Sequence, residues 1–118
     1  MSGFNVEFYT KSSGEKPAKD FLLSLDEKMK VKAFGIVELL QEYGNQLREP
    51  YSKPLEDGIF ELRIKVGNNI TRVFYFFYYE KRIILTNGFV KKSQKTPEIE
   101  KLLAKKYRED FLNREKRG

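Results

Sequence analysis

The chain has 118 residues, of which 40% are hydrophobic and 14% aromatic, and it contains neither cysteine nor histidine. This length and composition predict one folded domain over residues 1–118 and exclude a chain that is disordered throughout. The missing residue types exclude disulfides, thiol nucleophiles, Ser-His pairs and zinc sites made of Cys or His. The net charge of +6 favours polyanionic partners, with nucleic acid as the first candidate.

The first third of the chain predicts one strand and two helices. Residues 4–9 (FNVEFY) are rich in β-forming residues and predict a strand. A proline stands at the start of a short helix predicted over residues 17–25. A second helix is expected to begin after the N-cap Asp26 and to end before Gly44. Its apolar residues recur at helical spacing and predict a face packed on a sheet: Met29, Ala33, Ile36, Leu40 and Tyr43.

Three further strands are predicted in the middle of the chain. Residues 45–57 hold two prolines and mixed charges, which is typical of a connecting loop. Residues 59–66 alternate between apolar and polar side chains, as a half-buried strand does. A Gly-Asn-Asn turn separates them from residues 70–79, which are apolar on both faces and predict a central strand. Residues 82–89 predict the last strand.

The C-terminal segment predicts a basic helix. Apolar residues at helical spacing extend over residues 98–113, and residues 114–118 are expected to fray. Ten Lys or Arg residues lie between positions 91 and 118 against five acids, and on charge alone a solvated helix surface is slightly favoured over a nucleic-acid-binding one. The predicted order is β-α-α-β-β-β-α. It defines an α+β fold, a small antiparallel sheet of about four strands with two N-terminal helices on one face and a C-terminal helix.

Three stretches of the sequence carry a resemblance to a known family. They are Lys53 through Gly58 to Glu61-Leu62-Arg63, then Arg72-Val73-Phe74-Tyr75, and then the run GFVKKSQKTP that ends at Pro97. In this order and spacing they resemble toxins of the RelE/ParE superfamily, in its phage-derived HigB-like branch. The resemblance implies a RelE-like fold. Asn87 stands where many relatives carry histidine before Gly-Phe, so no acid–base role is expected of that position.

The candidate site consists of cations. Arg63 lies on the polar face of its strand, and Arg72 lies in an apolar strand, where burial is unfavourable unless the guanidinium meets an anion. Lys91 and Lys92 directly follow the last strand, so the sheet could gather these groups around a phosphodiester. The resemblance implies catalytic roles for Arg63, Arg72 and Lys92. It also implies RNA-binding roles for Lys53, Lys91 and Lys95. Phe76 and Tyr78 share a strand face with Arg72 by alternation, so either ring could stack on a base if that face is open.

Structural explanations compete with each of these roles. Arg63 could pair with Glu61 or Glu80 across the sheet, and the lysines could form a solvated loop. Phe76 and Tyr78 could pack in the core. Glu56 and Glu61 are taken as ordinary surface acids.

The function that the resemblance implies is that of a toxin in a type II toxin–antitoxin system, an endoribonuclease that cleaves mRNA on the ribosome without metal or cofactor. A HigA-like helix-turn-helix antitoxin is the expected partner, with operator DNA bound by the joint complex. No signal peptide or membrane span is expected, and the expected location is the cytoplasm. The alternatives are a ParE-like toxin that binds DNA gyrase, a non-catalytic nucleic-acid-binding module, and a decayed phage remnant.

Overall fold

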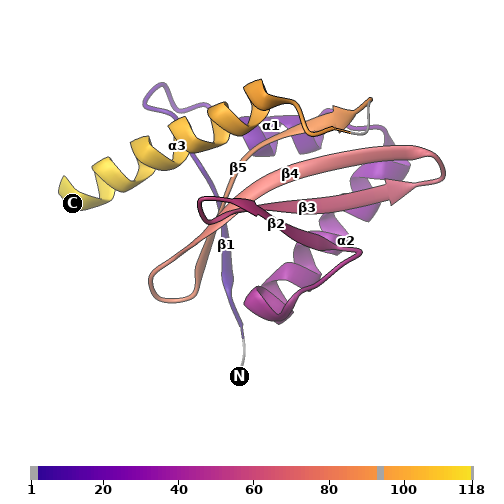
Figure 1. Ribbon diagram of the computed structural model, residues 1–118, viewed down its shortest axis with the longest axis horizontal. Helices are drawn as coiled ribbons and strands as arrows, with labels where there is room; N and C mark the ends of the chain where they lie inside the picture. The colour runs from indigo at the N-terminus through magenta and orange to yellow at the C-terminus, as the bar shows by residue number, and fades with distance from the viewer. Residues whose placement is uncertain (1–2, 93–94, 118) are drawn as a thin grey trace.

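The computed structural model describes residues 3–92 and 95–117, which form a five-stranded sheet with helices on both faces (Figure 1). The elements are β1 (Asn5–Phe8), α1 (Pro17–Leu23), α2 (Glu27–Tyr43), a short 3-10 helix (Gly44–Gln46), β2 (Ser52–Glu56), β3 (Ile59–Val66), β4 (Asn69–Tyr78), β5 (Arg82–Lys91) and α3 (Glu98–Arg117). The predicted α+β class is confirmed. None of the described helices is long and apolar enough to cross a bilayer.

The sheet is mixed rather than antiparallel throughout. Its strand order is β1-β5-β4-β3-β2, and the four strands from β2 to β5 pair antiparallel. β1 pairs with β5 in parallel, with Asn5 opposite Arg82 and Phe8 opposite Leu85. The expectation of a purely antiparallel sheet was therefore wrong. Alternation along a strand shows which side chains face the core, but it carries no information on the direction of the neighbouring strand.

The expected loop at residues 45–57 contains β2, so the sheet has one strand more than predicted. β2 forms the edge of the sheet and pairs only with β3, which explains how it accommodates Pro54: an edge strand does not need every backbone N–H. The Ser52 side chain is 3% exposed, and its hydroxyl is hydrogen-bonded to the Tyr75 hydroxyl on β4. The polar composition of this segment therefore gave no indication that Ser52 is buried in the folded domain.

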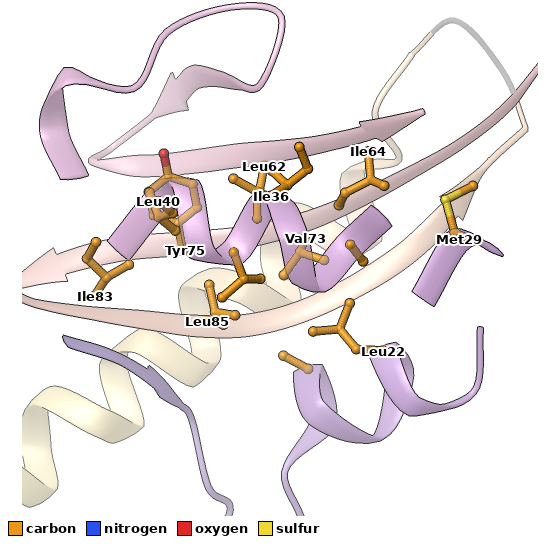
Figure 2. Close-up of a cluster of buried hydrophobic side chains, with 13 residues drawn as sticks. Leu22, Met29, Ile36, Leu40, Leu62, Ile64, Val73, Tyr75, Ile83 and Leu85 are labelled. Atoms are coloured by element: carbon orange, nitrogen blue, oxygen red, sulfur yellow. The ribbon is translucent and has the colours of Figure 1, made fainter. Parts of the chain in front are cut away.

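Helices α1 and α2 cover one face of the sheet and enclose the larger hydrophobic core. Figure 2 shows Leu22 of α1 and Met29, Ile36 and Leu40 of α2 packed against side chains from β3, β4 and β5. The predicted cap is confirmed, because the Met29 backbone N–H donates to Asp26 Oδ1 at 3.0 Å. Gly44 ends α2 with φ of 51°, as expected, and a Cβ at this position would lie 2.1 Å from the Phe4 ring.

Helix α3 packs on the opposite face of the sheet and forms a second core. Ala104 is fully buried there against a set of strand residues that includes Phe74, Phe76 and Phe89. The helix continues to Arg117, so the prediction of fraying from residue 114 was wrong for the part that is described. Its last turns are anchored by side chains: Arg82 on β5 donates to Glu115 at 3.2 Å.

Candidate phosphate-binding groove

A groove lies on the α3 face of the sheet, beside the first turn of that helix. Its volume is about 520 Å³, and we refer to it as the cation groove. It is lined by Lys53, Leu55, Glu61, Arg63, Lys91, Lys95, Thr96, Pro97, Glu98 and Lys101. Five of these described residues are cationic and two are acidic, so the lining has a strong excess of positive charge.

Strand register explains why these side chains converge. Residues opposite each other in neighbouring strands share a face of the sheet. Arg63 on β3 lies opposite Arg72 on β4, and Arg72 in turn lies opposite Phe89 on β5, which packs under α3. On the other side, Lys53 of β2 lies opposite Glu61 of β3. All of these side chains therefore belong to the α3 face, at the end of the sheet that the helix leaves uncovered.

Glu61 occupies the centre of the site. Its side chain is 1% exposed, and its Oε2 atom lies 2.7 Å from Arg72 Nε and 3.7 Å from Arg63 Nε. Both contacts are ion pairs, and the one with Arg72 is the shorter. The second carboxylate oxygen accepts a hydrogen bond from the Thr96 hydroxyl at 3.3 Å. The anion that Arg72 requires in its apolar strand is therefore a carboxylate of the same chain.

The cations of the groove repel one another. Burial lowers the pKa of Arg72, and the charge of Arg63 lowers it further, whereas the charge of Glu61 raises it. Burial also lowers the pKa of Lys91, followed by the charges of Arg72, Arg63 and Lys53, with Glu61 again acting in the opposite direction. A single internal carboxylate does not compensate so many positive charges, and an anion bound in the groove would relieve their repulsion.

Most of the expected site residues are brought together here. Arg63, Lys53, Lys91 and Lys95 line the cation groove, and Arg72 lies directly beneath it with 7% of its side chain exposed. Lys92 is exposed and is not among the lining residues. Its catalytic role stays a prediction, and the geometry does not support it. The expected pairing of Arg63 with Glu61 is present, with Glu49 4.0 Å away as a second acid.

The aromatic candidates lie elsewhere. Phe76 is 3% exposed and its ring centroid is 5.7 Å from that of Phe111 on α3, so the structure places it in the core and out of reach of a base. Tyr78 is half-buried, with its ring 5.1 Å from Phe111 and 5.2 Å from the Arg82 guanidinium. It lies outside the cation groove, and its contact with a base stays a prediction. Asn87 is buried and donates to the carbonyl and carboxylate of Glu100.

Sequence reasoning missed Glu61 and Thr96. The position of Glu61 on the polar side of an alternating strand predicts a surface acid, but its side chain is 1% exposed and its carboxylate contacts Arg72 and Thr96. A signal was present: Glu61 and Arg63 are two residues apart, and side chains with this spacing share a face of a strand. Among the described residues, no three His, Cys, Asp or Glu side chains converge as metal ligands would.

Comparisons with known proteins bear on the family and the fold of the chain. Residues 20–109 match the family model described as "Phage derived protein Gp49-like". The fold is similar to that in the crystal structure of the archaeal RelE-RelB complex from Pyrococcus horikoshii OT3, with a TM-score of 0.50 and 18% identity over 76% of this chain and 96% of that one. No curated protein sequence shows significant similarity to the chain. The family match and the RelE-like fold agree with the resemblance seen in the sequence, whereas the HigB-like branch is not confirmed.

Proposed function

Since the chain belongs to the phage-derived Gp49-like family, we propose that it is the toxin of a toxin–antitoxin pair and an endoribonuclease that cleaves mRNA on the ribosome. The observation that carries this proposal is the cation groove, where Arg63, Lys53 and Lys91 converge above the buried pair of Arg72 and Glu61. The RelE-like fold supports it as well.

The proposed reaction requires no group that the chain lacks. RNA carries its own nucleophile, the 2′-hydroxyl, which attacks the neighbouring phosphorus. The enzyme must then stabilise the charge that develops on the phosphorane oxygens, and preorganised cations supply the largest part of such stabilisation. Arg63 lines the groove with a planar guanidinium suited to two phosphate oxygens, and Arg72 adds a positive charge from below. Lys53 and Lys95, both exposed on the groove rim, hold the flanking phosphates.

The proposed partners are the ribosome, an mRNA and an antitoxin. The similar archaeal RelE structure is that of a complex with RelB, which supports an antitoxin for this chain as well. From the resemblance of its sequence to the HigB-like branch, we propose a HigA-like helix-turn-helix antitoxin whose complex with this chain binds operator DNA.

Two experiments test the function together. Expression of the chain alone should arrest growth, and co-expression of its antitoxin should restore growth. The purified chain should cleave mRNA on programmed ribosomes and leave the same mRNA largely intact when ribosomes are omitted. Growth arrest without RNA cleavage would instead indicate a gyrase-binding toxin of the ParE type, and a well-folded, well-expressed chain that is harmless would contradict the toxin proposal.

A further inference from the structure

Lys91 is half-buried in the cation groove, as Lys101 is, but unlike Lys101 it has no carboxylate within ion-pair distance among the described residues. It is the last residue of β5 and lies opposite Ile70 of β4, on the same face as Arg72 two positions along that strand. Its side chain is half-buried and lines the groove, whereas the next residue, Lys92, is exposed and does not. Of the two consecutive lysines, Lys91 is therefore the one that a phosphate in the groove would meet.

The described groups that face Lys91 come from β2, β3 and β4, from the segment before α3 and from the first turn of α3. β4 contributes Arg72, and β2 contributes Lys53. β3 contributes Glu61 and Arg63. The remaining charged lining residues are Lys95, Glu98 and Lys101. Within the described residues no acidic group lies in ion-pair distance of Lys91 itself, so its ammonium form is stabilised less than that of a paired lysine.

The other candidates for a proton acceptor are less suitable. Arg63 and Arg72 stay protonated, because a guanidinium does not release its proton in proteins. Glu61 is 1% exposed and both of its oxygens are already engaged, by Arg72 and by Thr96. Lys101 forms ion pairs with Glu56 and Glu98, and its hydrogen bonds to these acids raise its pKa.

We propose that the Lys91 amine is the proton acceptor for the attacking 2′-hydroxyl, an inference that rests on the proposed ribonuclease function. The neutral amine takes the proton as the 2′-oxygen bonds to phosphorus. The bond from phosphorus to the 5′-oxygen then breaks, and that oxygen takes a proton from solvent water. The products are a 2′,3′-cyclic phosphate and a 5′-hydroxyl, and Lys91 is left as an ammonium. Burial and the charge of Arg72 lower the pKa of Lys91, which increases the neutral fraction near neutral pH.

The test is single-turnover cleavage of mRNA on programmed ribosomes as a function of pH, for the parent and for Lys91→Arg. Arginine keeps the positive charge but accepts no proton, so RNA binding and its salt dependence should stay unchanged. Cleavage should be slower by roughly 10²–10³-fold. The parent rate should rise with pH and level off at the pKa of Lys91, whereas the variant rate should keep rising with hydroxide concentration. Lys32→Arg, an exposed change on α2, is the matched control.

A modified substrate distinguishes a base from an acid. When sulfur replaces the bridging 5′-oxygen, the leaving group needs no proton. Lys91→Arg should therefore remain slow on this substrate, and restoration of its rate would show that Lys91 acts as an acid. If Lys91→Arg folds poorly by thermal melting, Lys91→Ala with added alkylamines replaces it, and the rescued rate should increase with the basicity of the amine.

The outcomes separate the two levels of the proposal. An active parent with an equally active Lys91→Arg overturns the role of Lys91 and leaves the ribonuclease function in place. A Lys91→Ala variant that binds RNA normally and is rescued by no amine has the same two consequences. A parent that cleaves no mRNA on ribosomes overturns both.

Discussion

Replacing Glu61 with glutamine should strongly destabilise the fold, because the substitution keeps the shape of the side chain and removes the only acidic group within 4.0 Å of Arg72 among the described residues. The side chains of Arg72 and Glu61 are 7% and 1% exposed, so water cannot replace the lost charge. Removing one partner of a buried ion pair lowers the free energy of unfolding by about 3–5 kcal/mol. That is a large part of the roughly 5–15 kcal/mol that stabilises a typical domain.

The corresponding change in melting temperature follows from chain length. Unfolding entropy per residue gives a 118-residue domain about 0.25 kcal/mol per degree at the midpoint, so Glu61→Gln should lower Tm by about 12–20 °C. The double variant Glu61→Gln with Arg72→Met should recover most of this loss, since it removes both buried charges together. The assay is thermal and urea unfolding of the four proteins in the double-mutant cycle.

Phosphate provides an independent check of the same reasoning. In Glu61→Gln the groove lacks its internal anion, so millimolar inorganic phosphate should raise Tm more in this variant than in the parent. The double variant at equal ionic strength controls for general salt effects. A Glu61→Gln protein that melts within a few degrees of the parent, or that gains nothing from phosphate, would refute Glu61 as the counter-ion of the groove.

Three further outcomes are expected. Cleavage should persist in EDTA, provided that a control reaction that tolerates the chelator shows the ribosomes and the substrate to be intact. Complete loss of cleavage under these conditions would overturn the metal-free mechanism. Burial and the hydrogen bond to Asp110 raise the pKa of Tyr9 to about 12, above its ordinary 10.0. The stabilisation due to the protonated tyrosine is therefore complete below pH 10 and is lost as the pH rises to about 12. Over this range the free energy of unfolding of the parent should fall by an amount on the order of 2–3 kcal/mol. Tyr9→Phe should not show this fall. Finally, Gly88→Ala would place a Cβ 2.5 Å from the Phe21 ring. Calorimetry should show that the free energy of unfolding falls by about 1–3 kcal/mol. A variant as stable as the parent would contradict the close packing of α1 on β5.

Periodicity was sufficient to predict the layers of the fold. The alternation in residues 59–66 correctly placed Leu62 and Ile64 in the core, and the apolar stripe of α2 packs on them. The direction of β1 could not be predicted, because a parallel and an antiparallel strand have the same pattern of side chains. β2 could not be predicted either, since an edge strand that contains Pro54 and charged residues looks like a loop.

The candidate site was predictable as a set of cations but not as an electrostatic unit. The alternation placed Arg63 on the polar face, and the apolar surroundings of Arg72 indicated that it must meet an anion. That this anion is Glu61 depends on the register between strands and on burial in the folded domain, and neither can be read from local sequence. For the same reason the sequence did not distinguish Lys91 from Lys92, whose surroundings differ only once β5 is paired.

The central proposal is that RNA is cut in the cation groove. The measurement that tests it is single-turnover cleavage on programmed ribosomes by Arg63→Ala, with Lys32→Ala on the far face as the control. Arg63 suits this test better than Arg72, because 24% of its side chain is exposed and its loss leaves the buried pair beneath it in place. We expect Arg63→Ala to melt close to the parent and to cleave about 10²–10³-fold more slowly, as for the loss of one preorganised charge-stabilising donor. If a folded Arg63→Ala cleaves as fast as the parent and Lys32→Ala does not, the site lies elsewhere on the molecule.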